Sequence, residues 1–455
     1  MFDLIWALPL SLGYFWRGHR DGLKKSPFRY VRVCMLAFAL LRGRRTIANV
    51  ARWDGEGRHK SSYTRFFAQT SLPMYQLQRE LTEVTVALAK DLQPPRGRWY
   101  VLIDSTQSQH ESPEATPQGK KKGQRGPRRG QRLENAVRHR GGGKCSRIMV
   151  WGVLYDPETG ARIPLPRKIY RTKEWCRRQG RRFRTQVEMA ADLVHEAARV
   201  MRAVGFPADV EVIVVNDSAF TAQPVVKACA IQGFHYIGTL DSNRVVVDDP
   251  NRPNVGKLAG ELVQSQNWDQ VVTLHKPAKR GRGKPGQRAP GSTRQFNIHA
   301  KRCRISKLGE VQVVFSQAVG HPNGRVKIIV SSDPTLSGEE VCRRYALRWE
   351  IELMFKELKD DLGLDHAQMR SYRGWVRHVD LVWLTFTYLE WLRLRGLRQD
   401  GPEKRLYEQA RTRQMTYFLS REVRQAQVAW VRSKLRTARG RRELEEALER
   451  VVEVL

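Results

Sequence analysis

RWYVLIDSTQ, residues 98–107, is where the sequence changes from helical to strand-like patterns. Its apolar run has the length of one buried strand and stops at Asp104, which is followed by a serine and a threonine. A second run of this kind, DVEVIVVNDSAF at residues 209–220, stops at Asp217. Both acids are candidate site residues because each comes where an apolar strand is predicted to end.

The segments around these two runs predict a mixed α/β fold. Strand-like patterns cover residues 148–155 and 161–166, an amphipathic helix runs from about residue 183 to 201, and a helix and a strand follow Asp217. This order, with its hairpin-connected start, is that of ribonuclease-H-like folds. We therefore predict a ribonuclease-H-like catalytic core whose first part covers residues 96–240 and whose second part covers residues 336–395.

Three further regions complete the predicted organisation. For about ninety residues after Leu240 the sequence breaks into Gly-, Pro- and Arg-rich segments and short alternating runs, which predicts a β-rich insertion at residues 241–335. Residues 1–95 are predicted to form a helical DNA-binding domain. Residues 396–455 are predicted to be a helical C-terminal region, whose mixed charges are typical of a docking or partner-binding helix pair.

The N-terminal region contains two short helical patterns, TIANVARW and RHKSSYTRFF, on either side of a DGEG turn. This pattern is typical of a helix-turn-helix-like DNA reader, and a purely structural hairpin with a solvated basic face fits it equally well. The basic side chains of the hairpin are Arg52, Arg58, His59, Lys60 and Arg65. The first residues, MFDLIWALPLSLGYFW, are interpreted as a packed arm rather than a signal segment, because Asp3 precedes the apolar run and the basic residues follow it.

The charge balance predicts a polyanionic partner. The chain has 81 Lys and Arg against 46 Asp and Glu, a formal net charge of +35. Because this excess is spread along the whole chain, it favours nucleic acid over an anionic membrane surface. Residues 119–147 carry eleven basic residues against one acid and are predicted not to pack as a core, and residues 276–295 fit a loop lying along phosphates or a solvated loop in the free protein.

Composition also excludes several classes of protein. The six cysteines are widely spaced and form no CxxC pair, which argues against a zinc cluster or a disulfide scaffold and predicts a reducing, cytoplasmic location. The apolar run VCMLAFALL at 33–41 is far shorter than the ~20 residues that span a bilayer. We therefore predict no membrane segment.

A single helix is predicted from about Gly338 to Leu362, beginning with a capping box of Ser337 and Glu340. At 100° per residue, one arc of about 80° holds five polar side chains. These are Tyr345, Arg348, Glu352, Lys356 and Lys359. Apolar residues form a second face, and Glu350, Glu357 and Asp361 form a third face that is predicted to meet water.

The polar face is suited to phosphate, because arginine forks onto phosphate oxygens, lysine supplies a point charge and tyrosine a hydroxyl. Simple i,i+4 ion pairs are the structural alternative, and they leave Tyr345 and Lys359 unexplained. If the helix crosses the sheet, Glu352 lies above Asp104 and Asp217 at the carboxyl ends of adjacent strands. Three carboxylates predict a Mg²⁺ or Mn²⁺ site, and two such ions support in-line phosphodiester displacement.

These residues resemble the bacterial DDE transposases of insertion sequences, in the insertion-sequence-four-like family with the YREK signature. Tyr345, Arg348, Glu352 and Lys359 match the signature's spacing, and NDSAF resembles the family pattern around its second acid. The resemblance covers roughly residues 98–395. It implies a ribonuclease-H-like core, two divalent ions, and action as a homodimer on paired ends of double-stranded DNA in the bacterial cytoplasm.

The resemblance further implies a role for each matching residue. Asp104, Asp217 and Glu352 are implied to be catalytic metal ligands, and Tyr345, Arg348 and Lys359 to contact phosphate near a cleaved end; Lys356 shares their face and is predicted to contact DNA. Some relatives stack a flipped base on a tryptophan of the insertion. No tryptophan lies between Trp268 and Trp349. Trp268 or Phe315 could stack a base instead, although both fit core positions better, so the route of second-strand cleavage stays open.

Three functions remain compatible with the sequence. The first is a transposase that cleaves transposon ends and transfers the 3′-hydroxyl to target DNA. The second is a ribonuclease-H-like nuclease without strand transfer, and the third is a domesticated DNA-binding protein. Retention of all three acids argues against the third. Terminal inverted repeats beside the coding DNA would distinguish the first from the others.

Overall fold

The computed structural model describes residues 8–17, 25–92, 97–111, 134–138, 144–275, 293–321, 324–367, 369, 371–408, 410–437 and 439–446. Its helices are α1 Leu10–Phe15, α2 Lys25–Leu40, α3 Ile47–Trp53, α4 Lys60–Gln69, α5 Met74–Leu92, α6 Lys173–Arg178, α7 Gln186–Ala203, α8 Gln223–Gln232, α9 Val255–Ser265, α10 Gly338–Ala346, α11 Trp349–Asp360, α12 Tyr372–Gly396, α13 Pro402–Glu408 and α14 Thr412–Leu435. Its strands are β1 Arg98–Glu111, β2 Val137–Arg138, β3 Lys144–Asp156, β4 Ala161–Pro164, β5 Lys168–Ile169, β6 Glu211–Val215, β7 His235–Thr239, β8 Gln270–His275, β9 Thr293–Ile305, β10 Gly309–Ala318 and β11 Lys327–Ser331.

All the described strands join one mixed sheet in the order β2-β3-β1-β6-β7-β11-β10-β9-β8, with β4 and β5 also paired to β3. The strands β1, β6 and β7 are parallel, and β1 and β3 form the antiparallel hairpin predicted at the start. The parallel strands are buried on both faces, which explains why β6 is an uninterrupted apolar run rather than an alternating one. The mixed α/β fold predicted from the sequence is therefore present.

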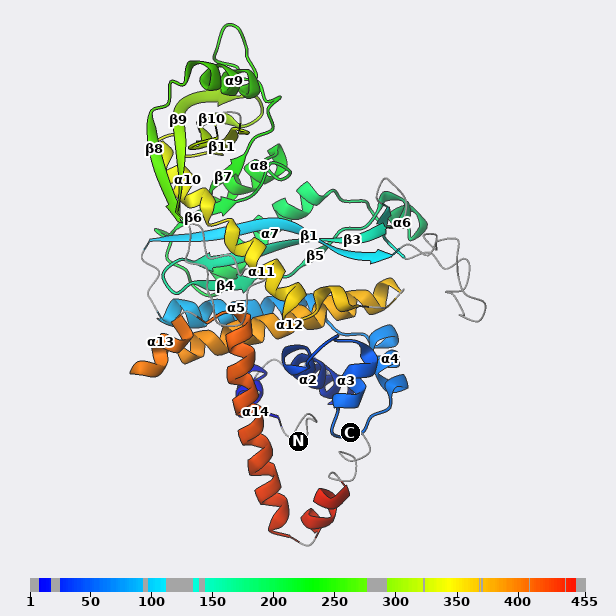
Figure 1. Cartoon of the computed structure of the whole chain (residues 1–455). Coiled ribbons are helices and arrows are strands. Elements are labelled where there is room, and N and C mark those ends of the chain that lie inside the picture. Colours follow the sequence, from blue (N-terminus) through cyan, green and yellow to red (C-terminus); the bar gives the residue numbers. More distant parts are fainter. Residues whose placement is uncertain are drawn as a thin grey trace.

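The β8–β11 strands extend this sheet instead of forming a separate one. β11 pairs antiparallel with β7, with Ser331 opposite Ile237, so the region predicted as an insertion continues the core sheet on the β7 side. In Figure 1 these strands and α9 form a lobe at one end of the molecule. Phe315 is buried within it and Trp268 packs on its core, as expected for core residues.

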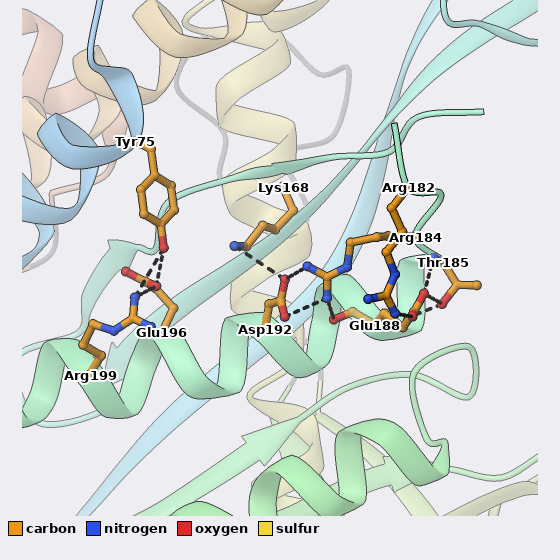
Figure 2. Close-up of polar contacts among 9 residues, drawn as sticks. All are labelled: Tyr75, Lys168, Arg182, Arg184, Thr185, Glu188, Asp192, Glu196 and Arg199. Atoms are coloured by element: carbon orange, nitrogen blue, oxygen red, sulfur yellow. Dashed lines mark hydrogen bonds and ion pairs between the residues drawn. The ribbon is translucent and has the colours of Figure 1, made fainter. Parts of the chain in front are cut away.

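Helix α7 packs closely on β3, because a Cβ at Gly152 of that strand would lie 3.4 Å from the Cβ of Leu193 on α7. A row of acids along α7 is neutralised by cations of α7 itself and of other segments, and by a hydroxyl from α5 (Figure 2). Asp192 binds Arg184 and Lys168, and Glu196 binds Arg199 and accepts a hydrogen bond from Tyr75 of α5, whose donor oxygen lies 2.6 Å away. This helix thus leaves little charge available for a partner.

Helix α12 is buried along nearly its whole length and organises the helical part of the molecule. Helices α2, α4, α5 and α14 pack against it. The N-terminal arm also packs there: Phe15 contacts Tyr388 and Trp391, and the Ser11 hydroxyl lies 2.6 Å from that of Tyr388. The prediction of a packed arm is confirmed for residues 8–17.

The predicted single helix from Gly338 to Leu362 is wrong, because the structure has two helices, α10 and α11. The amides of Leu347 and Arg348 bond the carbonyl groups three residues earlier, at 3.2 and 3.1 Å, instead of four. This 3₁₀-type turn winds more tightly than 3.6 residues per turn, so residues three apart become eclipsed. Tyr345 and Arg348 are such a pair, and their side chains meet.

The prediction that the acidic face of this helix meets water is also wrong. Glu350 forms an ion pair with Arg411 at 2.6 Å, and Glu357 forms one with the buried Arg162 at 3.0 Å. The Thr412 hydroxyl at the start of α14 donates to Glu357 as well, at 2.6 Å. The C-terminal region therefore covers this face. The sequence did not indicate Arg411 and Arg162 as partners because both lie far from the helix along the chain.

Part of the basic stretch at residues 119–147 packs in the core, contrary to the prediction. Arg147 on β3 is fully buried, donates to the carbonyl oxygens of Glu134 and Met369 at 3.0 and 3.2 Å, and lies over the Trp375 ring. Burial lowers the pKa of Arg147 to about 10. Residues 112–133, 139–143 and 276–292 lie outside the described residues, so the predictions made for those segments stay predictions.

Candidate active site

The two strand acids lie at the same level of the sheet. The parallel pairing of β1 with β6 ends at Leu102 opposite Val215, and Asp104 and Asp217 each follow two residues later. The prediction that β1 ends at Asp104 is wrong, since β1 continues to Glu111 along β3. What ends at Asp104 is the parallel pairing, and the space beyond β6 is where a helix can approach β1.

The turn that carries Asp217 is fixed by its own sequence, NDSAF. Asp217 accepts hydrogen bonds from the amide of Ala219 at its carboxylate and from those of Phe220 and Thr221 at its carbonyl. Phe220 is buried, and the buried Asn216 accepts a hydrogen bond from the Thr221 hydroxyl. The motif thus forms a rigid turn at the carboxyl end of β6.

Helix α11, which contains Glu352, lies across β1, which contains Asp104 (Figure 1). Arg348 bridges these two carboxylates: its guanidinium lies 3.1 Å from Asp104 and also bonds Glu352. Arg348 and Asp104 are only 15% and 14% exposed, whereas Glu352 is 31% exposed. The site is therefore largely buried at the sheet and open toward the helix.

The charges of Asp217 and Glu352 both act on Asp104. Burial raises the pKa of Asp104 to about 6, and the charge of Asp217 adds to this rise. Arg348 opposes it, and Glu352 adds a smaller contribution in the same direction as Asp217. The pKa of Asp217 is also raised by burial and opposed by Arg348. Three neighbouring carboxylates thus share one arginine, which leaves an excess of negative charge suited to a cation.

The other residues of the predicted polar face divide into three groups. Tyr345 is buried and its hydroxyl accepts a hydrogen bond from Arg348 at 3.1 Å, so it holds that arginine in place. Lys359 donates to the Gln107 carbonyl of β1 at 3.0 Å, beyond Asp104 along the strand. Lys356 is exposed.

Sequence reasoning missed Lys327 at the start of β11. Its ammonium lies 5.1 Å from the centre of the Tyr345 ring, and it senses the charges of Arg348 and Glu352. Burial, with Arg348, lowers the pKa of Lys327. The sequence around Lys327 is an ordinary alternating strand and does not indicate a site residue. Only the pairing of β11 with β7 brings Lys327 to the site.

A second group of possible ligands lies at the opposite ends of the same strands. Among the described residues, the three whose ligand atoms all lie within 4.8 Å of one another are Glu211, His235 and Asp333. Glu211 is already paired with Arg98 and Arg344, the latter at 3.2 Å. This cluster is therefore balanced by cations of the chain itself, and it is distinct from the predicted triad.

The donor set of the predicted triad fits a hard divalent ion. Asp104, Asp217 and Glu352 offer carboxylate oxygens only, which Mg²⁺ and Mn²⁺ prefer, and they carry more negative charge than Arg348 neutralises. The surrounding residues leave Glu352 accessible from solvent. An ion entering this site would replace Arg348 between the carboxylates.

A mixed sheet in this order, with acids where the central parallel strands separate and a third on a helix above them, fits the ribonuclease-H-like core of DDE transposases. Residues 184–387 match the family model of the transposase DDE domain, and this match supports a DDE transposase. The matched segment includes Asp217, Arg348 and Glu352, and begins after Asp104. The search of curated proteins found no match to the chain.

The family match supports two general statements, one about DNA and one about metal. A transposase DDE domain acts on DNA and depends on divalent metal, in agreement with the charge and the acids predicted from the sequence. Within the described residues, no helix is long and apolar enough to cross a membrane. The six cysteines are free and buried, as expected for a chain without a disulfide scaffold.

Proposed function

We propose that the chain is an insertion-sequence-four-like DDE transposase, which cleaves transposon ends and transfers the resulting 3′-hydroxyl into target DNA. The observation that carries this proposal is the arginine bridge between Asp104 and Glu352, next to Asp217. Arg348, Glu352 and Asp217 lie inside the segment similar to a transposase DDE domain. The YREK spacing of Tyr345, Arg348, Glu352 and Lys359 supports the narrower assignment.

Each residue of the site has a defined task in this proposal. Asp104, Asp217 and Glu352 hold two Mg²⁺ or Mn²⁺ ions, which when bound activate the attacking water or 3′-hydroxyl and stabilise the leaving oxygen. Arg348, once free of the carboxylates, forks onto oxygens of the scissile phosphate, and Tyr345 holds its orientation. In cleavage, the P–O3′ bond at the end breaks, the leaving oxygen takes a proton and water supplies the new P–O bond.

Lysines extend the phosphate-binding surface on either side of the arginine. Lys359 is held at the β1 backbone by its bond to Gln107, and Lys327 lies beside Tyr345. Lys356 is exposed one turn beyond Glu352, where it can reach the DNA backbone. In strand transfer the same surface holds the target phosphate while the 3′-hydroxyl attacks it. A new P–O3′ bond then forms, the P–O3′ bond of the target strand breaks, and its leaving oxygen takes the proton that the attacking hydroxyl loses.

The N-terminal helices supply a DNA-reading surface in the same proposal. The structure has the expected hairpin of α3 and α4, whose turn is held by the buried Asp54 through Tyr63 at 2.8 Å and Arg58 at 2.7 Å. The exposed side of α4 lines a shallow pocket formed by His59, Lys60, Ser61, Thr64 and Arg65. Arg52 is also exposed, whereas Arg58 is taken by the turn acids. This face suits duplex DNA, and the active form is a homodimer on paired ends.

The test uses a supercoiled plasmid that carries the DNA flanking both sides of the coding sequence. With Mg²⁺ or Mn²⁺ the wild-type protein should cleave it at the ends, and Asp104→Ala, Asp217→Ala and Glu352→Ala should each lower the rate by at least about 10³-fold. DNA binding should persist in all three. Asp360→Ala, an exposed acid on the same helix, is the matched control and should cleave normally.

The products separate the proposal from its alternatives. Covalent joining of the cleaved 3′ end to a second plasmid supports strand transfer, and cleavage without joining supports a nuclease. Binding without cleavage by the wild-type protein supports a domesticated DNA-binding protein. Cleavage that survives in Glu352→Ala would overturn the assignment of the site.

A further inference from the structure

Helix α6 and the turn after it expose five cations within ten residues. We call these side chains the α6 basic surface: Lys173, Arg177, Arg178, Arg181 and Arg182. Two of them approach acids only loosely, Arg178 at 3.9 Å from Glu174 and Arg182 at 3.9 Å from Glu188, with both arginines at least 60% exposed. Among the described residues, no carboxylate lies within 4.0 Å of the other three.

The adjoining segment behaves differently, which shows that this exposure is not general. Figure 2 shows that Arg184, two residues after the α6 basic surface, turns toward α7 and binds Asp192 with both of its terminal nitrogens. Arg199 and Lys168 are likewise held by α7 acids. These cations are held by acids of α7, whereas among the described residues the α6 basic surface makes only two ion pairs, both at 3.9 Å and both from exposed arginines.

The α6 basic surface is held rigidly. The Thr172 hydroxyl caps α6 by accepting from the Trp175 amide at 3.2 Å, and Trp175 packs on Tyr372 with ring centres 5.1 Å apart. After the helix, Gly180 adopts a left-handed conformation and the Arg181 amide bonds the Cys176 carbonyl at 2.9 Å. Cations presented on a fixed backbone lose less entropy when they bind a rigid partner.

The surface lies within reach of the site along the sheet. Ile169 of β5 pairs with Met149, which pairs with Thr106 of β1, so Ile169 is about 10 Å from Thr106. Adding two residues of strand to Asp104 and four extended residues to Lys173 gives a separation of at most about 30 Å. This is less than one turn of B-DNA, ~34 Å. Figure 1 places α6 at the end of the sheet toward which β1 runs.

We propose that the α6 basic surface binds the phosphate backbone of the duplex whose scissile phosphate lies at Asp104. The inference rests on the proposed function and adds a second contact region to the same DNA, on the flank of the sheet opposite the β8–β11 lobe. Lysine and arginine side chains at this spacing neutralise phosphates without reading bases, so the contact positions the duplex and does not select its sequence.

The test is DNA binding by the full chain without metal, so that it is independent of cleavage. The probe is a duplex of about 40 base pairs, titrated between about 50 and 200 mM salt. Arg177→Ala with Arg181→Ala removes two phosphate contacts, so the slope of log K against log salt should become shallower by about 1.8. Binding at the lower salt concentration should weaken by about tenfold or more.

Two further variants make this result decisive. Arg202→Ala with Lys227→Ala removes the same charge from exposed positions on α7 and α8, and should leave the slope unchanged. Arg177→Lys with Arg181→Lys should keep the wild-type slope. An unchanged slope in the α6 double alanine variant, or an equal loss in the α7 and α8 control, overturns the inference. If the wild-type protein does not cleave the ends, but the α6 double alanine variant still has a shallower slope of log K against log salt, only the proposed function is overturned.

Discussion

Helix α11 carries glutamates on two faces whose surroundings are opposite in kind. On one face Glu352 shares Arg348 with Asp104, and the acids outnumber the arginine. On the other face Glu357 forms an ion pair with Arg162 and accepts a hydrogen bond from a threonine hydroxyl, and Glu350 forms an ion pair with Arg411. The first face therefore has more negative than positive charge. On the second face the glutamates are paired with arginines, and α14 covers them.

The difference separates binding from folding on one helix. A carboxylate with a dedicated, buried arginine stabilises the fold, since the pair satisfies both charges and leaves nothing for a ligand. Carboxylates that compete for one arginine keep unsatisfied charge that a metal ion and a phosphate can complete. The two faces can therefore be tested with variants that differ by five residues, Glu352 and Glu357.

The largest expected effect is on stability, from Glu357→Ala. This change leaves Arg162, which is 2% exposed, without its ion pair, and an uncompensated buried charge costs about 3–5 kcal/mol. Urea unfolding followed by circular dichroism measures this loss. Cleavage per folded molecule should stay within about threefold of wild type, because Glu357 faces away from the site.

The reciprocal variant completes that comparison. Glu352→Gln should change the free energy of unfolding by less than about 1 kcal/mol, since Glu352 is partly exposed and shares its arginine. If Glu352→Gln unfolds the protein as readily as Glu357→Ala, the two faces do not differ in the way argued.

The three acids were identified as candidates from local patterns in the sequence. Asp104 and Asp217 end uninterrupted apolar runs, and such runs identify buried parallel strands because both faces of the sheet are covered. Glu352 was identified by its separation from the other acids of the helix. These signals are local, and each needs only the residues beside it.

The errors came from contacts that are not local. The break between α10 and α11 arises where α10 packs on β10 and β11 while α11 packs on β1, so a constant 100° per residue cannot describe both helices. The partners of Glu350 and Glu357 come from distant segments, as does Lys327. Hydrophobic periodicity contains no information about which distant charge will meet a given face.

A smaller effect is expected from Arg348→Gln, on metal affinity. Removing the cation between Asp104 and Glu352 should tighten Mn²⁺ binding in the absence of DNA by about tenfold, about 1.4 kcal/mol. In the wild-type protein, added duplex should tighten Mn²⁺ binding because phosphate draws Arg348 away, and this coupling should be largely lost in the variant. Mn²⁺ titration by electron paramagnetic resonance measures both quantities.

Arg343→Gln is the matched control for this prediction. Arg343 is an exposed arginine of α10 that pairs with Glu339 at 2.6 Å, so its loss should leave Mn²⁺ affinity and its coupling to DNA unchanged. Equal or weaker Mn²⁺ binding by Arg348→Gln would show that the arginine does not compete with the ion for the carboxylates.

The smallest effect concerns the pH dependence of stability on the closed face. Burial raises the pKa of Glu357, but Arg162 and its hydrogen bond outweigh burial and hold the folded-state pKa below the usual value. Glu357 therefore contributes stability above its unfolded pKa of about 4.5, and this contribution is lost as the pH falls through the folded-state pKa. Because glutamine cannot titrate, the gap in unfolding free energy between wild type and Glu357→Gln should narrow from pH 7 to pH 3. A gap that stays constant would mean that the ionised carboxylate of Glu357 does not stabilise the fold. The proposed difference in electrostatic role between Glu357 and Glu352 would then be wrong.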